Sequence, residues 1–251
     1  MRKPLRNALI GHTGFIGSNL LNLKKNLDLF NSKNIKKIKF KSYDTVYCAG
    51  TYSKIWIAKK KPNEDKKNLN KLINNLEKIN AKRFFLISTC EVFGKQKNTF
   101  ENSKINTNYK YAYGYNRHKL EKFIEKKFKD HFIIRLPIVY GNNFSKNFLY
   151  DLINSKNLDN LNGSDIVQIY DVSNLKKHIK YVEKKKIRKL NISSKPFKLK
   201  HLAKKFFKID LKANKKYRTI NMKSIYGKQK DNYFMSQKKI LKDLNLFLNK
   251  L

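Results

Sequence analysis

The chain opens with an apolar run, a loop that contains three glycines, and a second apolar run. RNALIG (6–11) has the length of a short buried strand, and Gly11, Gly14 and Gly17 follow one another at intervals of three. Glycines let a backbone turn tightly and approach a ligand closely, and the amides that open a helix can bind phosphate. The order of strand, glycine loop and helix therefore predicts a nucleotide-binding loop, with a ligand-free tight turn as the alternative.

Strand-like and helix-like segments alternate through the first 141 residues. The apolar runs predict strands over 6–11, 43–50, 83–89 and 131–141, and the helical spacing of apolar residues predicts helices over 15–30, 64–80 and 113–130. This alternation predicts a doubly wound, Rossmann-type α/β fold, in which helices cover both faces of a parallel sheet. The basic stretch after residue 30 is too short for the usual second and third strands. Either the sheet edge is trimmed, or one strand takes the place of both.

The pattern loosens beyond about residue 145. A strand that runs into a helix is predicted over 165–183, a short strand over 189–194, a short helix over 199–209, and an amphipathic helix near the C-terminus. We expect a dinucleotide-binding domain over 1–145, to which 165–195 returns. A small C-terminal substrate-binding subdomain is expected from 146–164 and 196–251.

The charge of the chain is strongly positive, with 58 Lys and Arg against 18 Asp and Glu, and a formal net charge of +40. A net charge of this size suggests nucleic acid as a partner. Lysine is, however, spread through every helix and loop, as in proteins encoded by AT-rich genomes, and neither a zinc-finger spacing nor an RNP motif is present. We therefore expect no nucleic-acid partner and no metal site.

Two further features bear on location. No apolar run approaches the roughly 20 residues that a membrane span needs, and the N-terminal apolar run is too short for a signal peptide. Cys48 and Cys90 lie far apart in the sequence and fit reduced thiols better than a disulfide framework. We expect a cytoplasmic protein with no membrane partner.

Small and polar residues follow four of the predicted strands. They occupy 11–17, 48–50, 88–94 and 137–141. Ligands of parallel α/β sheets bind at the carboxyl ends of the strands, so these four segments are expected to form one site.

The predicted helix over 113–130 carries a candidate acid–base group. Among the tyrosines of 111–119, only Tyr115 has a lysine, Lys119, four residues further on; at Tyr113 that place is taken by Arg117. Residues i and i+4 share a helix face, and a nearby ammonium lowers a phenol pKa toward a useful range. A solvent-exposed helix face is the alternative in a chain so rich in both residues.

Several segments together resemble the extended short-chain dehydrogenase/reductase family, whose members act mostly on nucleotide sugars. GHTGFIG (11–17) is similar to the family's G-x-T/S-G-F-I-G loop, and STCEVFG (88–94) is similar to its S-S/T-x-x-V-Y-G strand end. YDTVYCAG (43–50), IIRLPIVYG (133–141) and VQIYDVSNL (167–175) resemble later family segments in the same order. The resemblance covers about residues 5–205, and the chain is identified as a compact member.

This resemblance implies an NAD(P)-dependent oxidoreductase or epimerase that acts on a nucleotide-linked sugar. Tyr115 would donate or accept the proton, Lys119 would lower its pKa and hold the nicotinamide ribose, and Thr89 would orient the reacting oxygen, with Ser88 as the alternative hydroxyl. The cofactor-binding residues it implies are Gly11, Thr13, Gly14, Phe15, Ile16, Gly17, Cys48, Ala49, Gly50, Ser88, Lys119 and Pro137. It also implies a homodimer through the Tyr115 helix, although that helix's apolar face could be internal core.

The substrate residues are less sharply defined. The family's 4,6-dehydratases carry an Asp–Glu pair where this chain has Cys90 and Glu91, which puts dehydratase activity in doubt because a thiol is a poor acid for that elimination. The substrate candidates are Glu91, Asn147, Gln168 and Tyr170. The sequence does not separate an epimerase from a reductase.

The cofactor preference depends on the end of the predicted second strand, where an acid usually binds the ribose hydroxyls of NAD. FNSKNIKKIKF (30–40) has no acid, and Ser32, Lys33 and Asn34 could instead accept a 2′-phosphate. NADP is therefore preferred over NAD. A non-catalytic cofactor sensor or nucleic-acid-binding member of the same fold is the alternative function, but such a protein would have no need of Thr89, Tyr115 and Lys119 together.

Overall fold

The structure is a computed structural model that describes residues 6–52, 55–106, 112–228 and 231–251, except for the side chains of residues 56 and 57. The chain divides into two compact units. Unit 1 comprises 1–94, 105–135 and 174–190, and unit 2 comprises 95–104, 136–173 and 191–251. Compared with the expected division, unit 2 therefore also takes in 95–104, 136–145, 165–173 and 191–195.

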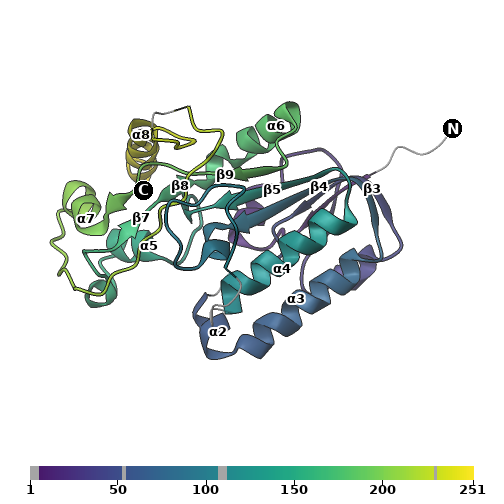
Figure 1. Cartoon of the computed structure of the whole chain (residues 1–251), viewed down its shortest axis with the longest axis horizontal. Helices are drawn as coiled ribbons and strands as arrows, with labels where there is room; N and C mark the ends of the chain where they lie inside the picture. Colours follow the sequence, from purple (N-terminus) through teal and green to yellow (C-terminus); the bar gives the residue numbers. More distant parts are fainter. Residues whose placement is uncertain (1–5, 53–54, 107–111, 229–230) are drawn as a thin grey trace. The chain divides into compact units, whose positions relative to one another are not determined.

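A six-stranded sheet forms the centre of unit 1, as Figure 1 shows. Its order is β2-β1-β3-β4-β5-β9, and the pairs of β1 with β2, β1 with β3, and β3 with β4 are parallel. The strands are β1 (Arg6–Ile10), β2 (Leu27–Phe30), β3 (Ser42–Cys48), β4 (Asn80–Thr89), β5 (His131–Leu136) and β9 (Lys189–Asn191). The predicted Rossmann-type sheet is thus confirmed.

Helices cover both faces of this sheet. The long helices α3 (Pro62–Leu76) and α4 (Ala112–Lys127) lie on one face and α6 (Leu175–Lys185) on the other (Figure 1). Strand residues alternate between the two faces, so Phe84 and Leu86 belong to the α3 and α4 side while Phe85 stacks between Tyr47 and Phe132. The shorter helical elements of the unit are α1 (Phe15–Ser18), η1 (Ile35–Ile38), α2 (Ile55–Lys60) and η2 (Cys90–Phe93).

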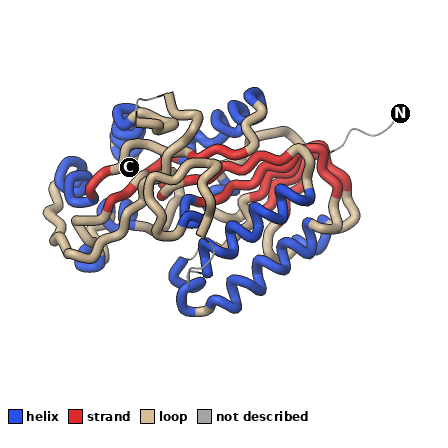
Figure 2. Tube along the Cα trace, viewed as in Figure 1, coloured by secondary structure: helices blue, strands red, loops and turns tan. Residues whose placement is uncertain are grey.

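The sheet edge corrects one expectation. The helix predicted over 15–30 is wrong: α1 has a single turn, and the chain then forms β2, an edge strand of the sheet whose strands Figure 2 draws in red. Asn26 adopts a φ of 54°, which turns the backbone out of helical geometry immediately before β2. The four-residue η1 is the one element between β2 and β3, and no further strand lies beyond β2 in the described sheet. The edge of the sheet is therefore trimmed, which is one of the two arrangements expected from the short segment after residue 30.

Unit 2 is built from short elements. Its strands form two pairs, β6 (Ile138–Tyr140) parallel to β8 (Ile169–Asp171), and β7 (Ile166–Val167) antiparallel to β10 (Phe197–Lys198). Its helices are α5 (Phe148–Ile153), η3 (Leu158–Asn160), η4 (Val172–Asn174), α7 (Leu199–Phe207) and α8 (Gln237–Leu248). The strand expected over 131–141 is interrupted at Pro137, which has no backbone N–H to donate, and becomes β5 and β6. In the described residues, no helix is both long and apolar enough to cross a membrane.

Candidate functional site

The glycine loop joins β1 to α1 through a closely packed turn. Gly11 adopts a φ of +89°, and its N–H donates to the carbonyl of Phe30 at 2.7 Å, which ties the loop to the end of β2. A Cβ on Gly17 would lie 2.0 Å from the Gly11 carbonyl oxygen. Both glycines are therefore required by the backbone itself, whatever the loop binds.

The end of β3 lies directly against this loop. The Ala49 N–H donates to the carbonyl of Ile10 at 2.9 Å, and a Cβ on Gly11 would come within 2.5 Å of the Ala49 carbonyl oxygen. Gly50 is equally close, since a Cβ there would meet the Ile10 side chain at 2.7 Å. Side chains are thus excluded where the backbones of β1 and β3 end side by side.

A cavity of about 520 Å³ opens at these strand ends. Its volume lies within the roughly 300–1,000 Å³ range of small-molecule sites. It brings together six of the predicted cofactor residues: Gly11, Thr13, Gly14, Ser32, Ala49 and Gly50. The other predicted cofactor residues do not line it: Phe15, Ile16, Gly17, Lys33, Cys48, Ser88, Lys119 and Pro137.

The far wall of the cavity was not predicted from the sequence. It comes from the segment after β3 and from α3 and α4, and its polar members are Thr51, Tyr52, Glu64, Asp65, Asn68, Lys71 and Arg117; Asn31 adds to the lining from the turn after β2. The helical spacing of 64, 68 and 71 was visible in the sequence, but nothing in that spacing distinguishes a cavity wall from a solvent-facing stripe.

Arg117 and Asp65 form a buried ion pair in this wall. The Nη1 of Arg117 donates to the two carboxylate oxygens of Asp65 at 2.8 and 2.6 Å, and Asn116 donates to the same carboxylate at 2.7 Å. The Nη2 of Arg117 donates to the Tyr52 carbonyl. The buried Nε of Arg117 has no hydrogen-bond partner among the described residues. The strand ends, which carry no side chains, leave the space that a dinucleotide needs beside this ion pair.

Comparison with known proteins agrees with this geometry. Residues 8–162, more than half of the chain, match the protein family described as RmlD substrate binding domain. The chain belongs to this family. None of the curated proteins compared with the chain matches it.

Solved structures similar to this family member share its fold at low identity. A dTDP-4-dehydrorhamnose reductase from Yersinia enterocolitica has a TM-score of 0.74 at 15% identity and covers 97% of this chain and 99% of its own. A reductase of the same name from Bacillus anthracis, in complex with NADP, has a TM-score of 0.65 at 17% identity over 87% and 84%. A UDP-N-acetylglucosamine 4-epimerase from Methanobrevibacter ruminantium has a TM-score of 0.71 at 16% identity over 98% of each chain. The resemblance to extended short-chain dehydrogenases/reductases is confirmed.

In this RmlD-family chain, α4 presents its two described tyrosines differently. Tyr115 is 44% exposed and Lys119 is exposed too, so the predicted pair is accessible to solvent on one side of the helix. Tyr113 is 7% exposed, and the Cζ of Arg117 lies 4.0 Å from its ring centroid. Burial raises the pKa of Tyr113, and the Arg117 cation opposes that rise. The tyrosine–cation pair that reaches the cavity, through Arg117, is therefore Tyr113–Arg117.

The end of β4 is held to α4 by a second buried network. The Ser88 hydroxyl donates to Glu121 at 2.6 Å, and Arg135 of β5 donates to the two oxygens of the same carboxylate at 3.0 and 2.7 Å. The hydroxyl hydrogen of Ser88 is therefore already used in a buried hydrogen bond. The neighbouring Thr89 oxygen accepts from the Glu91 N–H at 3.2 Å, which leaves the hydroxyl hydrogen for another partner.

The predicted substrate residues have structural roles of their own. Asn147 caps α5 by accepting from the Leu149 N–H, and Gln168, fully buried in unit 2, bonds three backbone groups of that unit through its amide. Tyr170 is fully buried and Glu91 is 8% exposed. Their substrate contacts stay predictions.

Proposed function

We propose that this chain is an NAD(P)-dependent oxidoreductase that transfers a hydride to or from a carbon of a nucleotide-linked sugar. The observation that carries the proposal is the cavity at the ends of β1 and β3, where Gly11, Ala49 and Gly50 leave room for a dinucleotide. Family membership and the names of the similar structures support the class of substrate.

Within this class we propose a reductase of a dTDP-linked keto sugar in preference to an epimerase or a dehydratase. Three of the similar structures are dTDP-4-dehydrorhamnose reductases, and the matched family is described by the name RmlD. Cys90 replaces the acid that a 4,6-dehydratase needs beside Glu91. NADP is the proposed cofactor, since the segment after β2 has no acid for the ribose hydroxyls.

The bound cofactor supplies the hydride, and the chain's own residues handle the proton and hold the reactants. Thr89 would donate its free hydroxyl hydrogen to the sugar oxygen. A tyrosine of α4 would give its proton to that oxygen as hydride reaches the adjacent carbon, and it would be reprotonated from solvent. Tyr115 with Lys119 is the pair predicted from the sequence. Tyr113 with Arg117 is an alternative pair: its cation lines the cavity, but Tyr113 itself is buried and its pKa is raised.

The proposal is tested with dTDP-4-dehydrorhamnose as substrate and NADPH as cofactor. Turnover is followed by the loss of NADPH absorbance in the wild type, Tyr113→Phe, Tyr115→Phe and Thr89→Val. We expect turnover by the wild type, with a loss of at least about a hundredfold in Thr89→Val and in one of the two tyrosine variants. NADPH binding measured by calorimetry should survive in all three variants.

The outcomes separate the claims. A large loss in Tyr113→Phe alone identifies the Tyr113 pair, and a large loss in Tyr115→Phe alone identifies the Tyr115 pair. Near-wild-type turnover in both single variants and in the double variant would refute tyrosine acid–base chemistry. Dinucleotide that copurifies tightly with the protein and stays bound through turnover would favour an epimerase instead.

A further inference from the structure

The ammonium group of Lys71 lies beside the turn that follows β2. Lys71 lies on α3 and lines the cavity at the strand ends together with Asn31 and Ser32. Its Nζ donates to the carbonyl of Ser32 at 3.1 Å, across 39 residues of sequence. An ammonium has three N–H donors, so two remain for a ligand beside Ser32.

Lys33, which the sequence suggested for this role, does not line the cavity. The turn after β2 is closed on itself: the Asn31 Oδ1 accepts from the N–H groups of Lys33 and Asn34, and the Asn34 Oδ1 accepts from the Asn31 N–H. This closed turn leaves Ser32, and not Lys33, in the cavity lining. Among the residues that line the cavity, the positive charge at this corner comes from Lys71 of α3.

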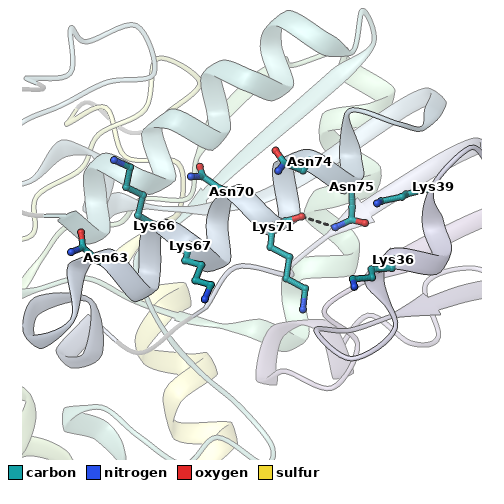
Figure 3. Close-up of a pocket in the computed structure, with 9 residues that line it drawn as sticks. All are labelled: Lys36, Lys39, Asn63, Lys66, Lys67, Asn70, Lys71, Asn74 and Asn75. Atoms are coloured by element: carbon teal, nitrogen blue, oxygen red, sulfur yellow. Dashed lines mark hydrogen bonds between the residues drawn. The ribbon is translucent and has the colours of Figure 1, made fainter.

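The neighbouring surface strengthens that charge. Lys71 also lines a groove of about 600 Å³ between α3 and η1 (Figure 3). The groove's described lining consists of five lysines and four asparagines and contains no carboxylate: Lys36, Lys39, Asn63, Lys66, Lys67, Asn70, Lys71, Asn74 and Asn75. An anion bound at Lys71 would gain from this potential over a short range, since salt screens exposed charges beyond about 10 Å.

The two carboxylates of the cavity do not oppose an anion at this corner. Asp65 is paired with Arg117 in the buried ion pair. Glu64 lies seven residues before Lys71 on α3, which places their backbones about 10 Å apart along the helix axis. The cavity is therefore polarised along α3, with its Lys71 end positive.

We infer that Lys71 and Ser32 form a subsite for a phosphomonoester, the 2′-phosphate of NADP, and that Lys71 sets the preference of this chain for NADP over NAD. The inference rests on the proposed dinucleotide function and names Lys71 as the residue that distinguishes NADP from NAD. A charge-assisted contact of this kind requires an ammonium within hydrogen-bond reach of the phosphate, and the remaining donors of Lys71 provide it.

The test is calorimetric binding of 2′,5′-ADP, which carries the 2′-phosphate, and of 5′-ADP, which lacks it. The proteins are the wild type, Lys71→Ala, Lys71→Arg and Lys67→Ala. Lys67 is the matched control, because it is a lysine one helical turn away on α3 that lines the groove but not the cavity. NADPH and NADH are titrated in parallel.

We expect Lys71→Ala to weaken 2′,5′-ADP and NADPH about tenfold, equivalent to about 1.4 kcal/mol, and to leave 5′-ADP and NADH within about twofold. Lys71→Arg should retain most of the preference, and Lys67→Ala should leave it unchanged. Equal weakening of both ligands in Lys71→Ala, or the same selective loss in Lys67→Ala, would overturn the inference.

The inference and the function fail differently. Binding of NADPH and NADH with equal affinity by the wild type would refute the subsite while leaving the dinucleotide function intact. Absence of binding by all four ligands would refute both.

Discussion

The Nη1 of Arg117 donates to both carboxylate oxygens of Asp65, at 2.8 and 2.6 Å, and joins α4 to the first turn of α3. Both side chains are almost fully buried, at 3% and 1% exposure. Removal of one partner from such a pair leaves an uncompensated buried charge. This pair therefore makes the placement of the α4 tyrosines dependent on a residue some fifty positions earlier in the sequence.

Arg117→Ala is expected to lower the free energy of unfolding by about 3–5 kcal/mol, because Asp65 would remain buried without its cation. Lys122→Ala is the control: it breaks an ion pair with Glu125 at 3.0 Å in which the lysine is 63% exposed, and should cost at most about 1 kcal/mol. Urea unfolding at neutral pH measures both. Similar costs for the two variants would show that the buried pair is dispensable.

Gly17→Ala and Gly14→Ala should separate two kinds of glycine in one loop. The added methyl carbon at position 17 would lie 2.0 Å from a backbone oxygen, whereas the one at position 14 would meet its nearest atom at 3.4 Å. We expect Gly17→Ala to lose at least about 3 kcal/mol of stability and Gly14→Ala less than about 1 kcal/mol. Thermal and urea unfolding check this, and a tolerated Gly17→Ala would contradict the packing of the loop.

Glu121 should make stability fall in acid. Burial alone would raise its pKa, but Arg135, His118 and Ser88 outweigh burial and lower the pKa from 4.5 to about 2. A group whose folded pKa is depressed contributes stability above its unfolded pKa, and that stability is lost as pH falls from about 4.5 toward about 2.

The measurement is urea unfolding from pH 7 down to pH 3 for the wild type and Glu121→Gln. The variant should be less stable at pH 7 by about 3 kcal/mol, since Arg135 loses its carboxylate, and its stability should fall less steeply below about pH 4.5. Parallel curves for the two proteins would exclude Glu121 as a source of the acid sensitivity.

Cys48 should be unreactive in the folded protein. It is fully buried at the end of β3, and burial raises its thiol pKa to about 11, so almost no thiolate exists at about pH 8. A colourimetric thiol reagent should therefore label Cys48 in urea but not in native buffer, with the labelled site assigned by mass spectrometry. Rapid labelling in native buffer would show that the end of β3 opens readily.

The sheet could be predicted from the sequence because a continuous apolar run such as 83–89 is typical of a strand that is buried on both faces of a parallel sheet. The helix expected over 15–30 failed because its apolar residues also suit a turn followed by an edge strand, and Asn26 gave no warning of its left-handed backbone. Apolar spacing reports which residues are buried and not which element buries them.

The side of the cavity formed by the glycine loop and the ends of β1 and β3 could be predicted, and the wall formed by α3 and α4 could not. The positions of Gly11, Gly14 and Gly50 in the cavity could be predicted from the local sequence, since glycines that follow a strand indicate that the backbone approaches a ligand or another segment closely. No such local signal marks Lys71 or Arg117. Lysine is common throughout the chain, and an arginine between Tyr115 and Lys119 belongs to no motif that predicts a cavity wall. The roles of Lys71 and Arg117 depend on how α3 and α4 are rotated about their axes; the rotation of α4 buries Tyr113 and leaves Tyr115 accessible to solvent.

The trimmed edge of the sheet determines where cofactor choice can be altered. Because only η1 stands between β2 and β3, the corner beside Ser32 is completed by α3 and not by a further strand–helix unit. An engineer who wished to convert the protein to the other nicotinamide cofactor would therefore begin with surface positions of a helix, which tolerate substitution well, and could leave the compact loop after β2 untouched.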